Sequence, residues 1–397
     1  MTAIRLDWVA RERRDSVSVE EMRSHDVVVH YSIPNHDTFG GGAPEAPSAI
    51  ESAKLRVDGG ELLVSRLNPH KPRVLITRPH DALAVCSGEF VVLKMSGEAD
   101  RRFLYWRLIS DDVTQRLSSR VQSVTRSQAR VSAEVIRKLW LELPSPEEQR
   151  RIADYLDDEV ARIDELIGEQ QQCIDLSRER HASLGEELIR SLLVSLPATR
   201  FAAWVTNYDS RIGKADQPVL LAVSIHDGVV PRHRLTDKPP RALDFENYKV
   251  CDVGDVVLNR LRAFQGGVGV SSERGLVSPD YMVLRPNSDV EPQFLHHLVR
   301  SSWFVGQMTA RLRGIGEAGQ GNVRTPRVNW SDLRLIKVPA VTVEGQRRLA
   351  AEMDADANQV DQLTEELTHQ IGLLREHRQA LITHAVTHGI DGLPGVA

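Results

Sequence analysis

Cysteine, aromatic residues and long apolar runs are all scarce in this 397-residue sequence. The three cysteines, Cys86, Cys173 and Cys251, are isolated, which argues against a disulfide framework and against a zinc site. No apolar run approaches the roughly 20 residues of a membrane span, and the first thirty residues are too charged for a secretory signal. These absences predict a soluble protein of a reducing cytoplasm, without a membrane partner.

The sequence also lacks the motifs of common catalytic sites. The glycine-rich segment 314–321 has no Lys-Ser/Thr after it, so it is not a P-loop for ATP. No GxSxG elbow, adenine-methylation motif or metal-nuclease set of carboxylates is present, and the histidines lack ligand spacing. We therefore predict no catalytic residue, no cofactor site and no metal site in this chain.

The main positive feature is an internal repeat with an offset of 191 to 197 residues. Each copy is too long for a solenoid unit and long enough to fold around its own core. The repeat predicts two similar but unequal modules, and a fused pseudo-dimer of structural purpose is the alternative. The matched segments are Trp8-Val9 with Trp204-Val205, Ser32-Ile33 with Ser224-Ile225, 60–67 with 254–261, Phe103-Leu104 with Phe294-Leu295, Arg130-Val131 with Arg327-Val328, Leu143-Pro144 with Val338-Pro339, and 149–153 with 346–350.

Charge is distributed unevenly along the chain, although the net charge is only −5. Residues 56–138 contain 15 Lys and Arg against 9 Asp and Glu, and residues 199–337 contain 19 against 14. Residues 147–190 contain 6 against 13, and residues 344–392 contain 4 against 9. A basic excess in both globular parts favours a polyanionic partner.

The two acidic segments have the apolar spacing of long amphipathic helices. Pro144 and Pro146, followed by Glu147 and Glu148, mark the start of the first helix, because proline and acid are favoured in a first turn. About 40 residues of helix make a rod of about 60 Å, and the two apolar stripes most economically bury each other. The first seam is Leu156, Val160, Ile163, Ile167, Gln170, Ile174, Ser177, His181, Leu184 and Leu188, and the second is Leu349, Met353, Asp356, Val360, Leu363, Leu367, Gln370, Leu374, Arg378, Leu381 and Ala385. We interpret His181 as a polar packing residue.

The globular parts have the pattern of mixed α/β domains. Short runs rich in β-branched residues, separated by Gly and Pro, predict a twisted, largely antiparallel sheet in each half. Helices are expected at about 101–120 and 291–312, each before a polar loop. The predicted strands are 27–29, 62–64, 74–76 and 90–93 in the first half and 219–223, 256–258 and 281–284 in the second.

Two polar loops in each half are the candidate recognition elements. Residues 68–73 correspond to residues 262–267, and residues 123–130 correspond to residues 314–327. Arg, Lys, Gln, Asn, Ser and Thr side chains pair with base edges and phosphates, whereas solvated turns are the plainer interpretation. The loops differ between the copies while the strands before them agree, which suits two different targets on one frame.

The order of these elements resembles the specificity subunit of type I restriction-modification systems. The resemblance rests on a "Leu-Pro-x-x-x-Glu-Gln" start of the first long helix at Leu143 to Gln149, and on an "Arg-Gln-x-Leu-Ile-x-x-x-Val-Thr" ending at Arg378 to Thr387. It covers essentially the whole chain. One departure is Gly345, where the family usually has Glu before Gln346.

The resemblance implies two tandem α/β target-recognition domains, separated by a long antiparallel two-helix coiled coil, in a pseudo-twofold repeat. The implied boundaries are 1–144 for the first domain, 145–196 for the first helix, 197–340 for the second domain, and 341–397 for the second helix and tail. Each domain would read one half of a bipartite, asymmetric site in double-stranded DNA, and the helices would set the spacer between the halves. Two methylase subunits and the restriction subunits would dock on the chain, so S-adenosylmethionine, ATP and Mg²⁺ belong to those partners.

On this hypothesis the polar loops supply the DNA contacts. A protein-binding scaffold on a coiled-coil rod is the alternative, and a standalone nuclease is disfavoured because no carboxylate and lysine set recurs between the halves. The candidate contacts are Arg66, Lys71, Arg73, Arg126, Gln128 and Arg130 in the first domain, and Asn259, Arg260, Arg262, Gln265, Gln320, Asn322, Arg324 and Arg327 in the second.

Overall fold

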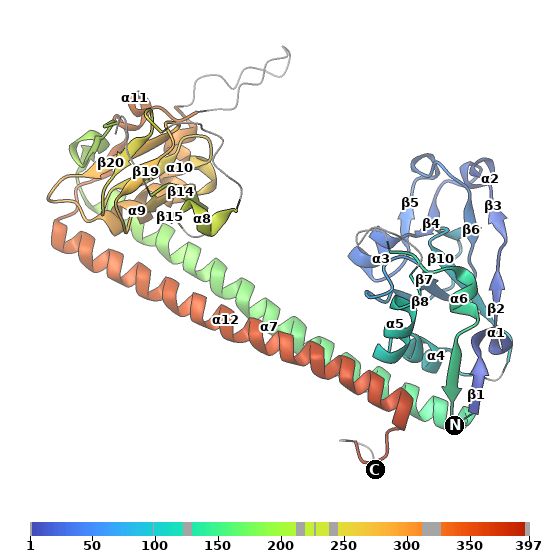
Figure 1. The fold of residues 1–397 in the computed structure, drawn as a ribbon. Coiled ribbons are helices and arrows are strands. Elements are labelled where there is room, and N and C mark those ends of the chain that lie inside the picture. Colours follow the sequence, from blue (N-terminus) through green and yellow to red (C-terminus); the bar gives the residue numbers. More distant parts are fainter. Residues whose placement is uncertain are drawn as a thin grey trace. The chain divides into compact units, whose positions relative to one another are not determined.

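The chain forms two compact units, each of which includes part of both long helices (Figure 1). The first unit comprises residues 1–171 and 368–397, and the second comprises residues 172–367. The first unit thus combines two segments that are distant in sequence, whereas the second unit is one continuous segment. The computed structural model describes residues 2–97, 99–121, 129–211, 219–225, 228–237, 245–311 and 327–393.

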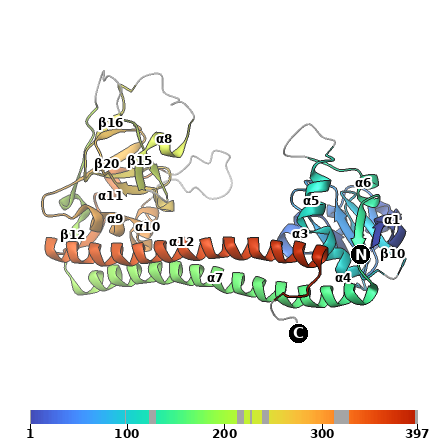
Figure 2. The same cartoon turned by 60° about the horizontal axis from the view of Figure 1, so that its bottom comes forward.

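The two predicted long helices are confirmed as α7, Pro146–Ser195, and α12, Val343–His388. Both begin at a hydroxyl that accepts a backbone hydrogen bond, since Ser145 Oγ accepts from Glu148 N and Thr342 Oγ1 accepts from Gly345 N, each at 3.3 Å. Such a cap satisfies one of the free N–H groups of a first helical turn. Figure 2 shows the two helices side by side and antiparallel, the arrangement that the family resemblance implied.

Polar residues of the two predicted seams contact each other within each unit. In the first unit Gln170 Nε2 donates to Gln370 Oε1 at 3.1 Å, and in the second His181 Nδ1 lies 2.6 Å from Asp356 Oδ2. A polar pair in an apolar seam disfavours every register that would separate its members. These residues therefore fix how α7 and α12 align, and His181 is a packing residue with a carboxylate partner.

The strands of the first unit form three sheets, where the sequence analysis predicted one sheet. A four-stranded antiparallel sheet has the order β2-β10-β7-β8, a five-stranded sheet has the order β3-β6-β9-β4-β5, and β1 pairs with β11. Within the five-stranded sheet β4 and β9 are parallel. The bounds are β1 Thr2–Arg5, β2 Ala10–Arg13, β3 Ser16–Val17, β4 Val28–Tyr31, β5 Ala43–Glu45, β6 Lys54–Arg56, β7 Leu62–Ser65, β8 Val74–Ile76, β9 Ala84–Cys86, β10 Phe90–Met95 and β11 Trp140–Leu143.

Short helices cover these sheets and begin at polar caps. Ser18, Ser32, Asp100 and Ser132 each accept a backbone hydrogen bond at the start of α2, α3, α4 and α6. The helix predicted at about 101–120 is two helices, because the chain breaks at Ile109 and Ser110. The bounds are α1 Leu6–Val9, α2 Val19–Arg23, α3 Ile33–Phe39, 3₁₀ helix η1 Pro47–Ala49, α4 Arg101–Leu108, α5 Asp111–Ser118 and α6 Ala133–Arg137.

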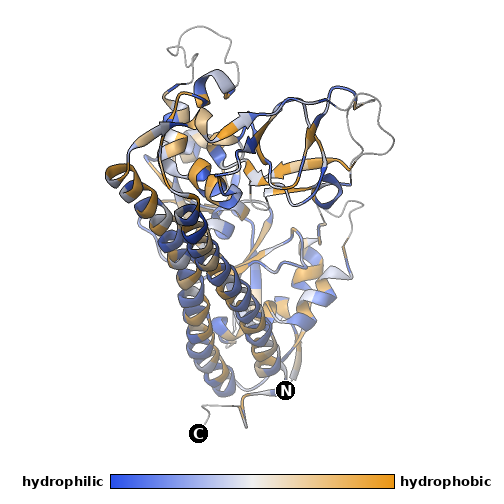
Figure 3. Cartoon of the chain, turned by 90° about the vertical axis from the view of Figure 1, so that its left-hand side faces the viewer, coloured by the Kyte–Doolittle hydropathy of each residue, from blue (hydrophilic) through white to orange (hydrophobic). Residues whose placement is uncertain are grey.

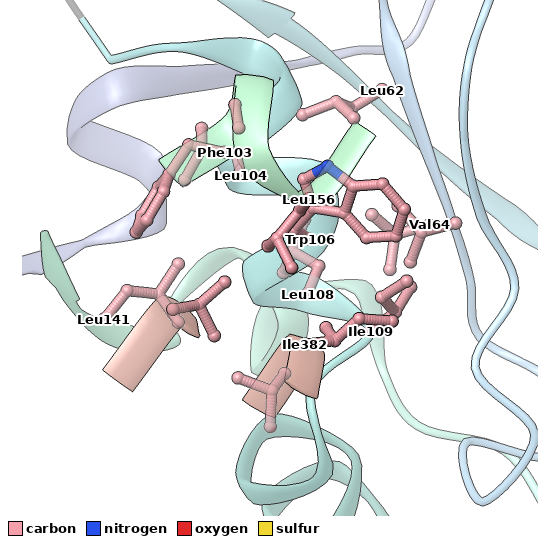
Figure 4. Close-up of a cluster of buried hydrophobic side chains, with 14 of the residues drawn as sticks. Leu62, Val64, Phe103, Leu104, Trp106, Leu108, Ile109, Leu141, Leu156 and Ile382 are labelled. Atoms are coloured by element: carbon pink, nitrogen blue, oxygen red, sulfur yellow. The ribbon is translucent and has the colours of Figure 1, made fainter. Parts of the chain in front are cut away.

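The main core of the first unit joins its sheet to both long helices. Side chains of β7, α4 and β11 pack against Leu156 of α7 and Ile382 of α12 (Figure 4). Phe103, Leu156 and Ile382 are completely buried. The apolar surface of the sheet and the apolar stripes of the helices thus form one core, which stabilises both elements together.

The second unit repeats this architecture, which confirms the internal repeat at the level of topology. Its four-stranded sheet has the order β13-β20-β17-β18, β12 pairs with β21, β14 pairs with β15, and β16 pairs with β19. The registers also match, since Val256 faces Leu284 as Leu62 faces Leu93. The strand bounds are β12 Ala198–Arg200, β13 Val205–Asn207, β14 Leu221–Ser224, β15 Gly228–Pro231, β16 Lys249–Cys251, β17 Val256–Asn259, β18 Val268–Val270, β19 Gly275–Val277, β20 Tyr281–Pro286 and β21 Lys337–Pro339.

Among the described residues, helices α9, α10 and α11 of the second unit correspond to α4, α5 and α6 of the first, whereas the smaller helices differ. Helix α3 lies between β4 and β5 in the first unit, whereas only residues 225–227 separate β14 from β15. Figure 3 shows largely apolar strands in the globular parts and mixed polar and apolar residues along the long helices. The bounds are 3₁₀ helices η3 Phe201–Ala203 and η4 Ala263–Gln265, and helices α8 Arg232–Leu235, α9 Pro292–Arg300, α10 Ser302–Thr309 and α11 Trp330–Leu333.

Candidate nucleic-acid interface

The described residues 129–131 lie beside the start of the loop 68–73, at the end of strand β7. The Nε of Arg66 donates to the carbonyl of Val131 at 3.3 Å, and Val131 N donates to the carbonyl of Arg66 at 3.0 Å. Asn68 N donates to the carbonyl of Ala129 at 2.7 Å, and Ala129 N donates to Asn68 Oδ1 at 3.2 Å. We call Arg66, Asn68, Glu89 and residues 129–131 the first strand-end cluster.

Asn68 reverses the chain direction within this cluster. Its φ of 51° is the one positive value among the described residues other than glycine. Asparagine tolerates this left-handed region better than other side chains, because its short amide can hydrogen-bond locally. The next turn is closed by Lys71 N, which donates to the carbonyl of Asn68 at 2.8 Å. The loop after β7 is thereby fixed at its base, with Lys71 exposed at its surface.

The second half builds the same arrangement at the end of β17. The Nε of Arg260 donates to the carbonyl of Val328 at 2.8 Å, and Val328 N donates back to the carbonyl of Arg260 at 3.2 Å. A further guanidinium nitrogen of Arg260 donates to Asn329 Oδ1 at 2.5 Å. We call Asn259, Arg260, Asp280 and residues 327–329 the second strand-end cluster.

Arg66 and Arg260 thus have the same place in their units, and each uses its Nε within the protein. Ser65 and Asn259, one residue earlier, are also equivalent, because each side-chain oxygen accepts from the backbone N–H two residues later, at 3.1 Å. These contacts leave only part of each guanidinium for an outside ligand. That Arg66, Arg260 and Asn259 contact DNA stays a prediction. Each of these side chains also forms a hydrogen bond with the protein backbone.

Ion pairs hold three other predicted arginines. Arg130 lies 2.7 Å from Glu89, and Arg327 lies 3.5 Å from Asp280. Arg73 donates two hydrogen bonds to Asp37 of α3, at 2.6 and 2.7 Å, and this contact lowers the pKa of Asp37 to about 2.

The remaining predicted contacts divide into exposed residues and residues outside the described ranges. Lys71, Arg262 and Gln265 are exposed, and Arg130 and Arg327 keep about half of their side-chain surface, 52% and 53%. The residues outside the described ranges are Arg126, Gln128, Gln320, Asn322 and Arg324.

The sequence analysis missed Asn68, Glu89, Asp280 and Asn329. The two acids could have been found from the repeat, because Glu89 and Asp280 have the same 191-residue offset as other matched pairs. They were overlooked because the search for nucleic-acid contacts was a search for basic and amide side chains.

A second repeated contact attaches each domain to its long helix. Gln149 Oε1 accepts from Asp100 N at 2.9 Å, and its Nε2 donates to the carbonyl of Pro144 at 2.9 Å. Gln346 likewise accepts from Glu291 N at 2.8 Å and donates to the carbonyl of Val341 at 2.9 Å. Both glutamines are buried. The glutamine near the start of each long helix therefore ties that helix to the start of α4 or α9.

The same junction differs between the units at one pair of positions. Trp106 Nε1 donates to Asp157 Oδ1 at 2.8 Å in the first unit, whereas His297 Nε2 lies 2.7 Å from Asp354 Oδ1 in the second. Burial lowers the pKa of His297, and Asp354 opposes that shift. Burial also lowers the pKa of the neighbouring His296 to about 3, and His297 and Arg300 add to this effect.

In the part of the chain that the structure describes, the His, Cys, Asp and Glu side chains form no group of three that could hold a metal ion. No helix in the described ranges combines the length and the apolar character that a membrane crossing requires.

Comparison with solved structures identifies the fold. No protein-family profile and no curated protein matches the sequence. A chain from a structure that concerns complex assembly and conformational transition of the type I R-M system has a TM-score of 0.73 and 19% identity, covering 98% of both chains. The HsdS subunit from Thermoanaerobacter tengcongensis has a TM-score of 0.54 and 17% identity, covering 98% of this chain and 97% of that one. The chain therefore has the fold of the HsdS subunit, as its resemblance to the type I specificity subunits predicted.

Proposed function

We propose that this chain is the non-catalytic DNA-specificity subunit of a type I restriction-modification complex. The observation that carries the proposal is the strand-end cluster, which occurs once in each unit with the same hydrogen bonds and an exposed arginine. The polar loops of the two halves differ in sequence, as two readers of different half-sites would require. The excess of Lys and Arg in both globular parts favours a DNA partner.

Each unit, on this proposal, contacts one half of a bipartite, asymmetric site in double-stranded DNA. Phosphate contacts from lysine and arginine would position the unit, and base contacts from arginine, glutamine and asparagine would select the sequence. Lys71, Arg262 and Gln265 are suited to this role because their side chains are exposed beside the clusters.

The partners in this proposal are two methylase subunits and the restriction subunits. The methylases would bind S-adenosylmethionine and modify adenine, and the restriction subunits would use ATP and Mg²⁺ to cleave unmodified DNA. The long helices suit protein partners better than DNA, because residues 147–190 and 344–392 are acidic. All catalysis would then lie outside this chain.

Mapping of methylated adenine in host DNA by long-read sequencing tests the proposal. The gene for this chain would be deleted and then restored from a plasmid. Loss of one bipartite motif on deletion, with its return on complementation, is the expected result. An unchanged methylome in a strain whose methylase is active would refute the proposal and would favour the scaffold hypothesis.

A residue-level test uses the matched arginines of the two clusters. Arg130→Ala and Arg327→Ala, each assembled with the methylase, should weaken binding to the cognate duplex and lower the slope of log K against log salt by about 1. Arg162→Ala is the control, because Arg162 is an exposed arginine of α7 that pairs with Glu159. If both cluster variants keep the wild-type affinity and slope, the clusters do not contact DNA.

A further inference from the structure

An acid lies beside the exposed arginine in both strand-end clusters. Glu89 Oε1 is 2.7 Å from Arg130 Nη2, and Asp280 Oδ1 is 3.5 Å from Arg327 Nη1. Each acid directly precedes an inner strand of its four-stranded sheet, which begins at Phe90 in the first unit and at Tyr281 in the second. The same juxtaposition has therefore been kept in two copies whose loops have diverged.

A serine turn fixes the position of each acid. Glu89 N donates to Ser87 Oγ, and Asp280 N donates to Ser278 Oγ, both at 3.3 Å. The next backbone N–H then donates to the carbonyl of the same serine, at 3.0 Å in the first unit and 2.9 Å in the second. The sequences between serine and acid differ, with Gly88 in one copy and a proline in the other. The turn thus places a carboxylate beside the arginine on two different local sequences, hydrogen-bonded to it in the first unit and at ion-pair distance in the second.

A carboxylate at this place opposes simple attraction to DNA. A phosphate that binds the Arg130 guanidinium must compete with Glu89, and it approaches a like charge when it does so. The contact of the arginine with a base edge is weakened less. A guanidinium that a carboxylate binds on one side can still present its remaining N–H groups to the two acceptors of guanine. The acid therefore weakens phosphate contacts, which any duplex offers, more than it weakens base contacts, which depend on the sequence.

We propose that Glu89 and Asp280 are specificity-determining residues, each of which restrains its arginine from general phosphate binding and so lowers affinity for DNA without the recognition sequence. This inference rests on the proposed function and deepens it. Discrimination between sequences depends on a difference of two affinities, and these acids increase the difference by weakening the unwanted one.

Glu89→Gln and Asp280→Asn test the proposal, because both changes remove the charge and keep the shape. Each variant, and the double variant, would be assembled with the methylase and titrated over a range of salt. One probe is a 30-base-pair duplex of mixed sequence, and the other is a duplex of equal length that carries the mapped methylation motif. Since exposed ion pairs have small energies, we expect each single variant to bind the mixed duplex about two- to fivefold more tightly. Affinity for the motif duplex should rise less than affinity for the mixed duplex, or should fall. The double variant should show roughly the product of the single effects.

Glu21→Gln is the matched control, because Glu21 of α2 forms the same kind of exposed ion pair with Arg56 of β6. It should leave the ratio of the two affinities at the wild-type value. If the wild-type protein prefers the motif duplex and Glu89→Gln and Asp280→Asn leave the ratio of the two affinities unchanged, this inference is overturned while the proposed function stands. Equal losses on both probes together with a lower melting temperature would also overturn it, since the acids would then only support the fold. Wild-type protein that binds neither probe would overturn the proposed function as well.

Discussion

Replacement of Gln149 by leucine should destabilise the first unit and leave the second unit unchanged. The Gln149 side chain is 3% exposed and bridges two backbone groups, Asp100 N–H and the carbonyl of Pro144. Leucine has a similar volume but no hydrogen-bonding group, so both backbone groups lose their partner without a large cavity. An unsatisfied buried polar group costs about 1–3 kcal/mol.

The two backbone groups left without partners should together lower the unfolding free energy by about 2–4 kcal/mol. This is the lower part of the summed range, because Asp100 and Pro144 are half-buried. For a unit of this size, about 2–4 °C of melting temperature is lost per kcal/mol, so the first unit should melt roughly 5–15 °C earlier. Gln346→Leu removes the equivalent contacts to Glu291 N and Val341 O, and should have the same effect on the second unit.

Calorimetry combined with hydrogen exchange can assign each loss to a unit. In Gln149→Leu, amides of α4 should exchange faster while those of α9 keep wild-type protection, and Gln346→Leu should show the reverse pattern. A change in unfolding free energy below about 0.5 kcal/mol in both variants would refute the reasoning, because substitutions away from structural contacts produce effects of that size. Equal loss of protection in both units would also contradict it.

Three further predictions concern the cores and the buried charges. Phe103→Ala and Phe294→Ala, at equivalent and buried positions, should each cost about 3–5 kcal/mol in unfolding free energy measured by denaturant titration, and equal stability to wild type in either variant would contradict the core assignment. His296 has a folded pKa near 3, below its value in the unfolded chain, so its neutral form stabilises the fold fully above about pH 6.5 and the stability falls as pH drops toward 3. The second unit should lose at least about 1 kcal/mol between pH 7 and pH 5.5, and His296→Tyr, which introduces the residue type of the first unit, should reduce that dependence in melting curves and leave the part due to His297. Burial favours the neutral form of Asp112, but hydrogen bonds from Arg107 and Ser110 outweigh it and hold the pKa of Asp112 below its usual range. Its contribution is therefore present above about pH 4 and lost as pH falls further, and Asp112→Asn should cost about 3 kcal/mol at neutral pH because it leaves the buried Arg107 unpaired, a result checked by urea unfolding at several pH values.

Much of the fold follows from the spacing of apolar residues. The repeat predicts two equivalent domains, the heptad seams predict α7 and α12, and the short β-branched runs predict β7, β10, β17 and β20. The division into several sheets could not be predicted, because pairing partners such as β4 and β9 are more than fifty residues apart and neither strand encodes its neighbour. The sequence pattern likewise does not indicate that the C-terminal part of α12 belongs to the same compact unit as the N-terminal strands.

The candidate site was predictable in position and less so in the direction of its side chains. Loop composition indicated residues near the ends of β7 and β17, and the structure places the described residues 129–131 and 327–329 beside those strand ends. Residue type alone does not reveal that Arg66 and Arg260 donate inward to backbone carbonyls, because an arginine can bind a carbonyl, a carboxylate or a phosphate with the same groups. The carboxylates of Glu89 and Asp280 were not predicted, because an acidic side chain repels phosphate and its residue type does not indicate a place at a DNA interface.

The packing of α12 into the first core has a consequence for synthesis of the protein. Leu381, Ile382, Ala385 and Val386 belong to the core that also contains Leu6 and Leu62. When the ribosome has translated residue 200, every strand of the first unit exists but the residues that close its core do not. About 190 further residues must be added, which takes roughly 10–40 s at bacterial rates of elongation. The second unit is complete by residue 367, so the half that is made first is the last to finish folding and remains exposed to proteases for longest.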